Sequence, residues 1–156
     1  MRRSDHPIRI ILLWAFALIW IAVLFFFSAQ TAEESGSLSM WATEVLLRLC
    51  PWIPLDAATL HPIIRKLAHF CFFGVEGFLL GLASLNTFRA GLSVGMSVVA
   101  CAAMAALNEY RQMFAKGRSC EVRDMLIDFS GAVLGIVFAA LVFSICSRAR
   151  RHERKN

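Results

Sequence analysis

The chain has 156 residues, of which 58% are hydrophobic and only 17% are charged. In a soluble domain about half of the residues are apolar and about a quarter are charged, so this composition argues against a soluble protein. The formal net charge of +5 comes largely from basic residues that flank apolar runs. That arrangement indicates membrane topology, and we expect no nucleic-acid partner.

Four apolar runs are long enough to cross a bilayer. Each contains roughly 17 to 22 residues, and a helix of about 20 residues crosses about 30 Å of hydrocarbon. The predicted spans cover residues 8–27, 67–85, 91–107 and 125–146. The first run is too long for the hydrophobic region of a cleaved signal peptide, so we interpret it as an uncleaved helix. The sequence therefore predicts an all-α integral membrane bundle that forms a single domain over residues 1–156.

The segment after the first span has an amphipathic helical pattern. Apolar residues recur at helical spacing along one face, namely Leu38, Trp41, Ala42, Val45, Leu46 and Leu49. We expect Ser35 or Ser37 to cap this helix and Pro51 to end it. Two placements are open. In the first, the helix would lie in the membrane interface with Trp41 and Trp52 as anchors. In the second, it would pack on the spans as a lid.

Small residues four positions apart mark one face of the last three spans. The pairs are Gly77 and Gly81, Gly91 and Gly95, Ala102 and Ala106, and Gly131 and Gly135. Such pairs let helix backbones approach closely in a membrane, where no hydrophobic force drives helices together. They predict a tight bundle of these three spans, with the first helix more peripheral.

The distribution of lysine and arginine predicts the orientation. With four spans, both termini and the short 86–90 turn lie on one side of the membrane. That side has a small majority of the basic residues, including the tail over residues 147–156, which directly follows the last span. The positive-inside rule therefore places both termini in the cytoplasm and the segments 28–66 and 108–124 outside.

Polar and ionisable side chains gather where the last three spans meet the outer side. They are Arg65, Lys66 and His69 on the second span, Asn108, Glu109 and Gln112 on the third, Arg118 in the next loop, and Asp124 and Asp128 on the fourth. An acid at a helix centre costs about 2.5–3.5 kcal/mol on insertion scales, so each should face the bundle interior and have a partner. Any single pair could serve only to fix helix register. The convergence of histidine, carboxylates and arginine at one membrane face favours a functional site.

Glu76 differs from these residues in depth. It lies ten residues past Lys66 on the same face of the second span, which places it about 15 Å deeper, near the bilayer midplane. No basic residue is expected at that depth. Glu76 is therefore predicted to be neutral, or hydrogen-bonded to a neighbouring span.

Several short segments occur in a characteristic order over about residues 8–140. They are Ser28-Ala29-Gln30, Lys66-Leu67-Ala68-His69-Phe70, Glu109-Tyr110-Arg111-Gln112-Met113-Phe114, Gly117-Arg118-Ser119 and Asp124-Met125-Leu126-Ile127-Asp128-Phe129-Ser130-Gly131. In order and spacing they resemble the VanZ family of bacterial membrane proteins, named for a member associated with resistance to the glycopeptide teicoplanin. Asn108 and Phe72 stand where that family has acids, and Glu76 lies one turn beyond Phe72, so the resemblance assigns no role to Glu76.

The resemblance implies a multi-pass protein of the bacterial cytoplasmic membrane with a role in the cell envelope, but no defined reaction. The candidate anion-binding residues are Arg65, Lys66, Gln112 and Arg118, because guanidinium and ammonium groups bind phosphate. The candidate catalytic residues are His69, Glu109, Asp124 and Asp128, which could move protons or hold a divalent cation. The sequence identifies no cofactor, and no spacing such as HExxH marks a metal site.

Three functions are compatible with these residues. The first is binding or translocation of a membrane lipid or lipid-linked cell-wall precursor, linked to teicoplanin resistance. The second is an intramembrane hydrolase or transferase acting on a phosphate-bearing headgroup. The third is a structural role beside envelope protein partners. Because no serine or cysteine is marked as a nucleophile, the first function is favoured over the second.

Overall fold

The computed structural model describes residues 7–153, with side chains up to residue 149. The elements are α1 (Pro7–Ser28), α2 (Ala32–Leu49), α3 (Ala57–Thr87), α4 (Ala90–Gln112) and α5 (Val122–Glu153). Four of these helices, α1, α3, α4 and α5, are long and apolar enough to cross a membrane. The predicted all-α bundle of four membrane helices is confirmed, and α2 is the additional helix after the first span.

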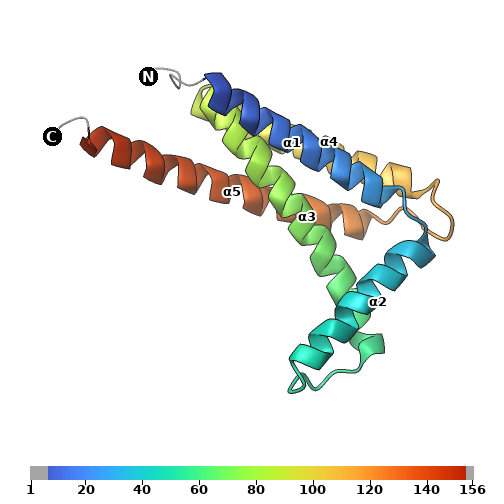
Figure 1. Ribbon diagram of the computed structural model, residues 1–156. Helices are drawn as coiled ribbons and strands as arrows, with labels where there is room; N and C mark the ends of the chain where they lie inside the picture. Colours follow the sequence, from blue (N-terminus) through green and yellow to red (C-terminus); the bar gives the residue numbers. More distant parts are fainter. Residues whose placement is uncertain (1–6, 154–156) are drawn as a thin grey trace.

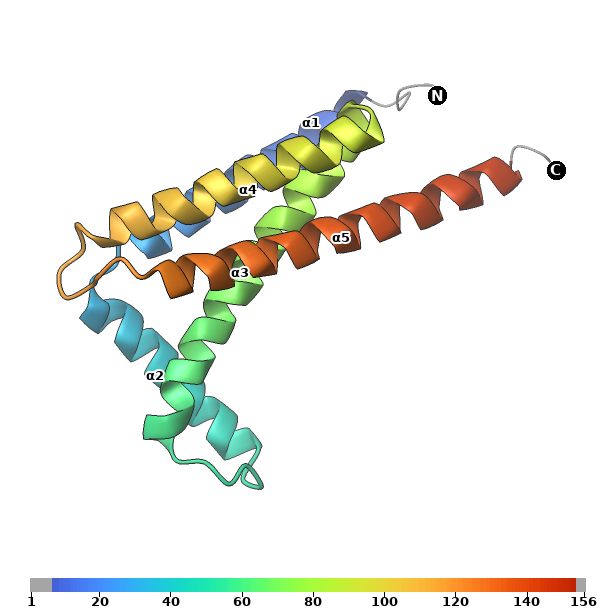
Figure 2. The ribbon, with the colours of Figure 1, turned by 180° about the vertical axis from the view of Figure 1, so that it is seen from behind.

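Helix α3 is the centre of the fold, because it packs against each of the other four helices. Figure 1 shows α1 and α4 along one half of α3, α5 crossing it, and α2 against its first turns. The start of α1 and the end of α5 point to the same end of the bundle as the turn between α3 and α4, with α5 diverging from the other helices (Figures 1 and 2). The opposite end, which contains residues 29–31 and 113–121, is called the loop end below. The start of α1 and the end of α5 are therefore on one side, as expected for four spans.

Helix α3 is longer than the second predicted span. It begins at Ala57, well before residue 67, and has 31 residues. At 1.5 Å per residue it is about 46 Å long, which exceeds the roughly 30 Å of a hydrocarbon core. The first turns of α3 therefore project past the spans at the loop end, where α2 packs against them (Figure 2).

Helix α2 begins earlier than the sequence pattern indicated. The Thr31 hydroxyl accepts a hydrogen bond from the Glu34 backbone N–H at 3.2 Å, and the Glu34 carboxylate accepts one from the Thr31 backbone N–H at 2.8 Å. This capping box satisfies two donors that the helix start leaves free. The predicted caps at Ser35 or Ser37 were therefore wrong.

The position of α2 combines features of both predicted placements. Its Ser39 hydroxyl lies 2.7 Å from Nε2 of His61 on α3, which joins the two helices. The indoles of Trp41 and Trp52 remain 62% and 76% exposed, as expected of residues at a membrane interface. Helix α2 thus packs on the projecting part of α3 and leaves its two tryptophans accessible.

Glycine permits the crossing of α3 and α5. A Cβ atom added at Gly77 would overlap the backbone of Ala132, and one added at Gly135 would overlap the backbone of Gly74. Gly131 is likewise in close approach to the backbone of Phe70. The predicted close packing of small residues is confirmed for these two helices.

The expectation for the third span was wrong within this chain. Nothing lies within 4 Å of a Cβ added at Gly91 or Gly95. Ala102 and Ala106 are exposed, whereas Cys101 and Ala105 are fully buried. The packed face of α4 is therefore rotated away from its pattern of small residues.

Helix α1 is peripheral, as predicted. Of its 22 residues, only Ala17, Leu24 and Ser28 are buried. Two indole N–H groups attach it to α3, with Trp14 donating to the Thr87 hydroxyl at 3.0 Å and Trp20 donating to the Phe72 carbonyl at 2.9 Å. Helix α1 thus forms an outer wall of the bundle.

Candidate functional site

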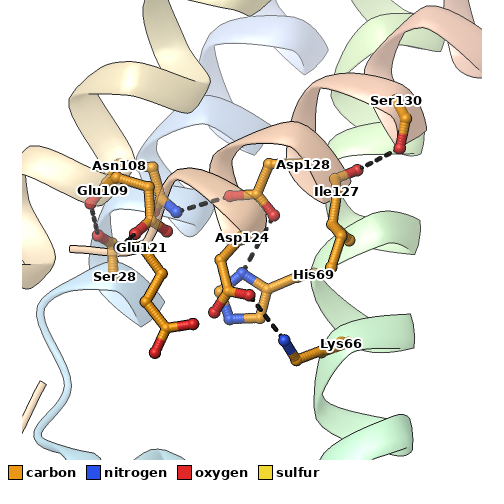
Figure 3. Close-up of polar contacts among 10 residues, drawn as sticks. All are labelled: Ser28, Lys66, His69, Asn108, Glu109, Glu121, Asp124, Ile127, Asp128 and Ser130. Carbon is orange, nitrogen blue, oxygen red and sulfur yellow. Dashed lines mark hydrogen bonds and ion pairs between the residues drawn. The ribbon is translucent and has the colours of Figure 1, made fainter. Parts of the chain in front are cut away.

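The polar side chains expected near one membrane face do converge at the loop end of the bundle (Figure 3). An ion pair and a histidine–carboxylate contact join α3 to α5 there. Nζ of Lys66 lies 3.0 Å from Oδ1 of Asp124, and Nδ1 of His69 lies 3.2 Å from Oδ1 of Asp128. Lys66 and His69 are three residues apart on α3, and Asp124 and Asp128 are four residues apart on α5. Each spacing is about one helical turn, so the two contacts stack along the helix crossing.

Asp128 has no exposed side-chain surface, and both of its carboxylate oxygens have partners. Oδ1 contacts His69, and Oδ2 accepts a hydrogen bond from Nδ2 of Asn108 on α4 at 2.9 Å. An acid at position 108 would place a second carboxylate beside Asp128. The amide of Asn108 instead donates a hydrogen bond to it. The three helices α3, α4 and α5 therefore meet at one buried carboxylate (Figure 3).

The contact with Asp128 fixes the orientation of the His69 ring. Since Nδ1 faces Asp128, Nε2 is on the other side of the imidazole, and the side chain is 25% exposed. Among the side chains that the structure describes, Nε2 has no hydrogen-bond partner. This is the arrangement in which a carboxylate sets the tautomer of an imidazole and leaves one nitrogen for a ligand.

Glu109 is 1% exposed and ties the end of α4 to the start of α5. Its Oε2 accepts a hydrogen bond from the Glu121 backbone N–H at 3.0 Å, while Oε1 has no partner within the described residues. On the neighbouring side, the Ser28 hydroxyl donates to the Asn108 carbonyl at 3.4 Å and joins α1 to the same region. The carboxylate of Glu109 thus holds the loop that carries Arg118.

Gly117 has a φ of +77°, a left-handed conformation that glycine adopts without steric cost. The Ala32 backbone N–H donates to the Lys116 carbonyl at 3.1 Å, so this loop is also attached to the start of α2. These two features set the position of Arg118 between α2 and the bundle. The Gly-Arg-Ser segment was noted in the sequence, but its attachment to α2 could not be predicted from it.

Arg65 and Arg118 form no ion pair with any side chain in the described range. Burial and the nearby positive charge of Arg65 lower the pKa of Arg118, and the charge of Glu109 opposes this effect. Nε of Arg118 is buried and has no hydrogen-bond partner among the described residues. Two cationic side chains therefore face the same region with incomplete compensation.

A polar pocket of about 260 Å³ lies in this region. Of the eight candidate site residues, six line it: Arg65, Lys66, His69, Gln112, Arg118 and Asp124. Glu109 and Asp128 do not line it and instead position residues that do. Gln112 is buried, and its Nε2 donor has no partner in the described part of the chain. Ser119 also lines the pocket and was missed, although it follows Arg118 directly.

Glu76 lies away from this pocket. It is 1% exposed, and neither carboxylate oxygen has a hydrogen-bond partner in the described structure. The alternative that Glu76 is hydrogen-bonded to a neighbouring span is thus not found. Within residues 7–149, no group of three or more His, Cys, Asp or Glu side chains has the arrangement of a metal site.

The family model of VanZ/LLP1 matches residues 13–143, a range that includes every residue of the candidate site. No curated protein and no solved structure shows a significant match to the chain. The family match covers most of the chain and agrees with its four apolar helices, which indicate a multi-pass membrane protein. The chain therefore belongs to the VanZ/LLP1 family.

Proposed function

We propose that this protein binds the phosphate-bearing headgroup of an anionic, lipid-linked component of the cell envelope at the outer leaflet. The observation that carries the proposal is the pair Arg65 and Arg118. Both residues line one pocket, and neither forms an ion pair with a described side chain. A bound dianion would supply the missing negative charge.

The charges around the pocket support an anionic ligand. Lys66 forms an ion pair with Asp124, which offsets its charge, and His69 contacts Asp128. Arg65 and Arg118 have no ion-pair partner among the described residues, although Glu121 also lines the pocket, and the Nε2 donor of Gln112 has no partner in the described structure. Guanidinium groups bind phosphate oxygens in a bidentate manner, which suits a tetrahedral headgroup better than a single carboxylate.

The outer leaflet follows from the proposed orientation. The basic residues after α5 favour the cytoplasm for both termini, which would place the loop end and its pocket on the outer face of the bacterial cytoplasmic membrane. Cell-wall precursors linked to lipid phosphates are present at that face. If the protein holds or moves such a precursor, teicoplanin has less access to it. We propose this as the link to the resistance that the family membership suggests.

The proposal is tested by measuring the binding of dodecyl phosphate and of dodecanol to the purified full-length protein. Dodecyl phosphate should bind and dodecanol should bind at least about tenfold more weakly, since a charged hydrogen-bonded contact contributes about 1.5–3 kcal/mol. Arg65→Gln and Arg118→Gln should each lower the affinity for dodecyl phosphate to a similar extent. Arg118→Lys should also lower it, because lysine cannot reproduce the bidentate contact.

Arg123→Gln is the matched control, because Arg123 is exposed and does not line the pocket. It removes the same charge from the same end of the bundle and should leave the affinity unchanged. If Arg123→Gln weakens binding as much as Arg118→Gln, the effect is one of general surface charge and the proposed site is wrong.

A second function, phosphoryl transfer from the same headgroup, is favoured by the contact between His69 and Asp128. His69 lines the pocket and is held at Nδ1 by a buried carboxylate, which leaves Nε2 to act as a base or nucleophile. Purified protein would then release inorganic phosphate from dodecyl phosphate. His69→Asn should abolish release while it retains binding. Binding without release by the unaltered protein would exclude this second function for that substrate.

A further inference from the structure

A second cavity, of about 180 Å³, lies beside the polar pocket and has a different chemical character. Its walls are mainly apolar and come from three helices, with Leu24 and Phe27 on α1, Leu38 and Ala42 on α2, and Ile64 and Phe72 on α3. Arg65, His69 and Arg118 line this cavity as well as the polar pocket. The two arginines are therefore at the boundary between an apolar and a polar compartment.

The walls of the apolar cavity are held by specific contacts. The ring of Phe72 packs against Trp20 at 5.3 Å and against Phe27 at 5.5 Å between centroids, which joins α1 to α3. Helix α2 is attached at two points, through Ser39 and His61 and through the backbone of Ala32. The cavity is thus a defined space between three fixed helices.

We propose that the ligand is a lipid phosphate with a single hydrocarbon chain, whose first carbons lie between α1, α2 and α3 while its phosphate lies between Arg65 and Arg118. This inference rests on the proposed function and specifies its ligand. Arg65 and Arg118 line both cavities, and this arrangement matches the change from charge to hydrocarbon within one lipid phosphate. An apolar cavity of about 150 Å³ holds one benzene ring, so this cavity of about 180 Å³ accommodates about six carbon atoms, which suits the first carbons of one chain.

The inference is tested with water-soluble phosphates and the purified full-length protein in detergent. The probes are inorganic phosphate, the series from ethyl to decyl phosphate, and dihexanoyl phosphatidic acid, which has two chains. Affinity should rise about fourfold per methylene up to about six carbons and then level off, since a buried methylene contributes that factor. Dihexanoyl phosphatidic acid should bind more weakly than hexyl phosphate.

A variant that fills the apolar cavity separates the chain from the headgroup. Ala42→Phe should remove the dependence on chain length and leave the affinity for inorganic phosphate unchanged. Ala103→Phe is the matched control, because Ala103 is exposed on α4 and lines neither cavity. It should leave the whole series unchanged.

The outcomes distinguish this inference from the function on which it rests. If all alkyl phosphates bind as inorganic phosphate does, and Arg118→Gln weakens all of them, the chain site is wrong and the phosphate site stands. If dihexanoyl phosphatidic acid binds as tightly as hexyl phosphate, the restriction to one chain is wrong. If no phosphate probe binds, the proposed function itself fails. The chain-length series on the unaltered protein decides these points even if Ala42→Phe does not fold.

Discussion

His69 and Asp128 are 59 residues apart in the sequence, yet Nδ1 of the imidazole lies 3.2 Å from Oδ1 of the carboxylate. The contact joins α3 to α5 next to their crossing, and Asn108 of α4 contacts the other oxygen. One buried carboxylate thus fixes the relative positions of three spans and the direction of the histidine that lines the pocket.

We predict that His69 and Asp128 are energetically coupled. In a double-mutant cycle with His69→Ala and Asp128→Ala, the two losses of unfolding free energy should not add, with a coupling of about 1 kcal/mol or more. Unfolding of the protein in mixed micelles provides the measurement. The exposed pair Glu44 and Arg48, whose atoms are 3.9 Å apart, is the control, and its coupling should be at most about 0.5 kcal/mol. Equal coupling in both pairs would show that the buried contact has no special role.

The crossing of α3 and α5 gives a second prediction. Gly135→Ala should destabilise the protein by about 1–3 kcal/mol or more, because its Cβ would overlap the backbone of Gly74 and force the helices apart. Gly95→Ala places the same atom where nothing lies within 4 Å, so it should leave stability unchanged or slightly raise it. Thermal unfolding of both variants is the measurement. Equal destabilisation by the two changes would contradict the close approach.

These glycines also show how far the sequence could predict the fold. Apolar runs of bilayer length determine the spans, so the four membrane helices were correctly expected. Gly91 and Gly95 have the same spacing, but nothing lies within 4 Å of a Cβ added at either. The spacing shows that a helix face could pack closely, but it does not show which helix packs there. Thr31 and Glu34 form a capping box that the Thr-x-x-Glu spacing marks in the sequence, ahead of Ser35 and Ser37.

The candidate site was predictable in its membership but not in its pairing. The sequence places His69 and Asp128 each about one turn inside its span, so the two residues were expected at the same depth in the membrane. Whether Lys66 would bind an anion or pair with Asp124 depends on the rotation of α5 about its axis, which the sequence does not specify. The apolar cavity beside Arg65 depends on where α2 packs, and it was not anticipated.

Glu76 provides a third prediction. It is buried without a hydrogen-bond partner among the described residues, and an unpaired charge would be very costly there, so its carboxyl group should be neutral. Glu76→Gln keeps the shape and the neutral state, and it should change the unfolding free energy by no more than about 0.5 kcal/mol. Binding of dodecyl phosphate should also persist. A folded Glu76→Gln protein that no longer binds would show that the negative charge is required.

Orientation is the fourth prediction. In a variant without the five native cysteines, Lys116→Cys at the loop end should react with a membrane-impermeant maleimide in intact cells. Ala149→Cys, near the end of α5, should react only after the membrane is made permeable, because the basic residues around it favour the cytoplasm. Labelling of Ala149→Cys in intact cells would reverse the orientation and place the pocket inside.

The most direct test of the central claim is an experimental structure of the full-length protein with bound dodecyl phosphate. We predict phosphate density within hydrogen-bonding distance of the guanidinium groups of both Arg65 and Arg118, with the first carbons of the chain beside Phe72. Glu109 should remain bonded to the Glu121 backbone. Phosphate density elsewhere, or a structure in which Glu109 pairs with both arginines and closes the pocket, would contradict the account.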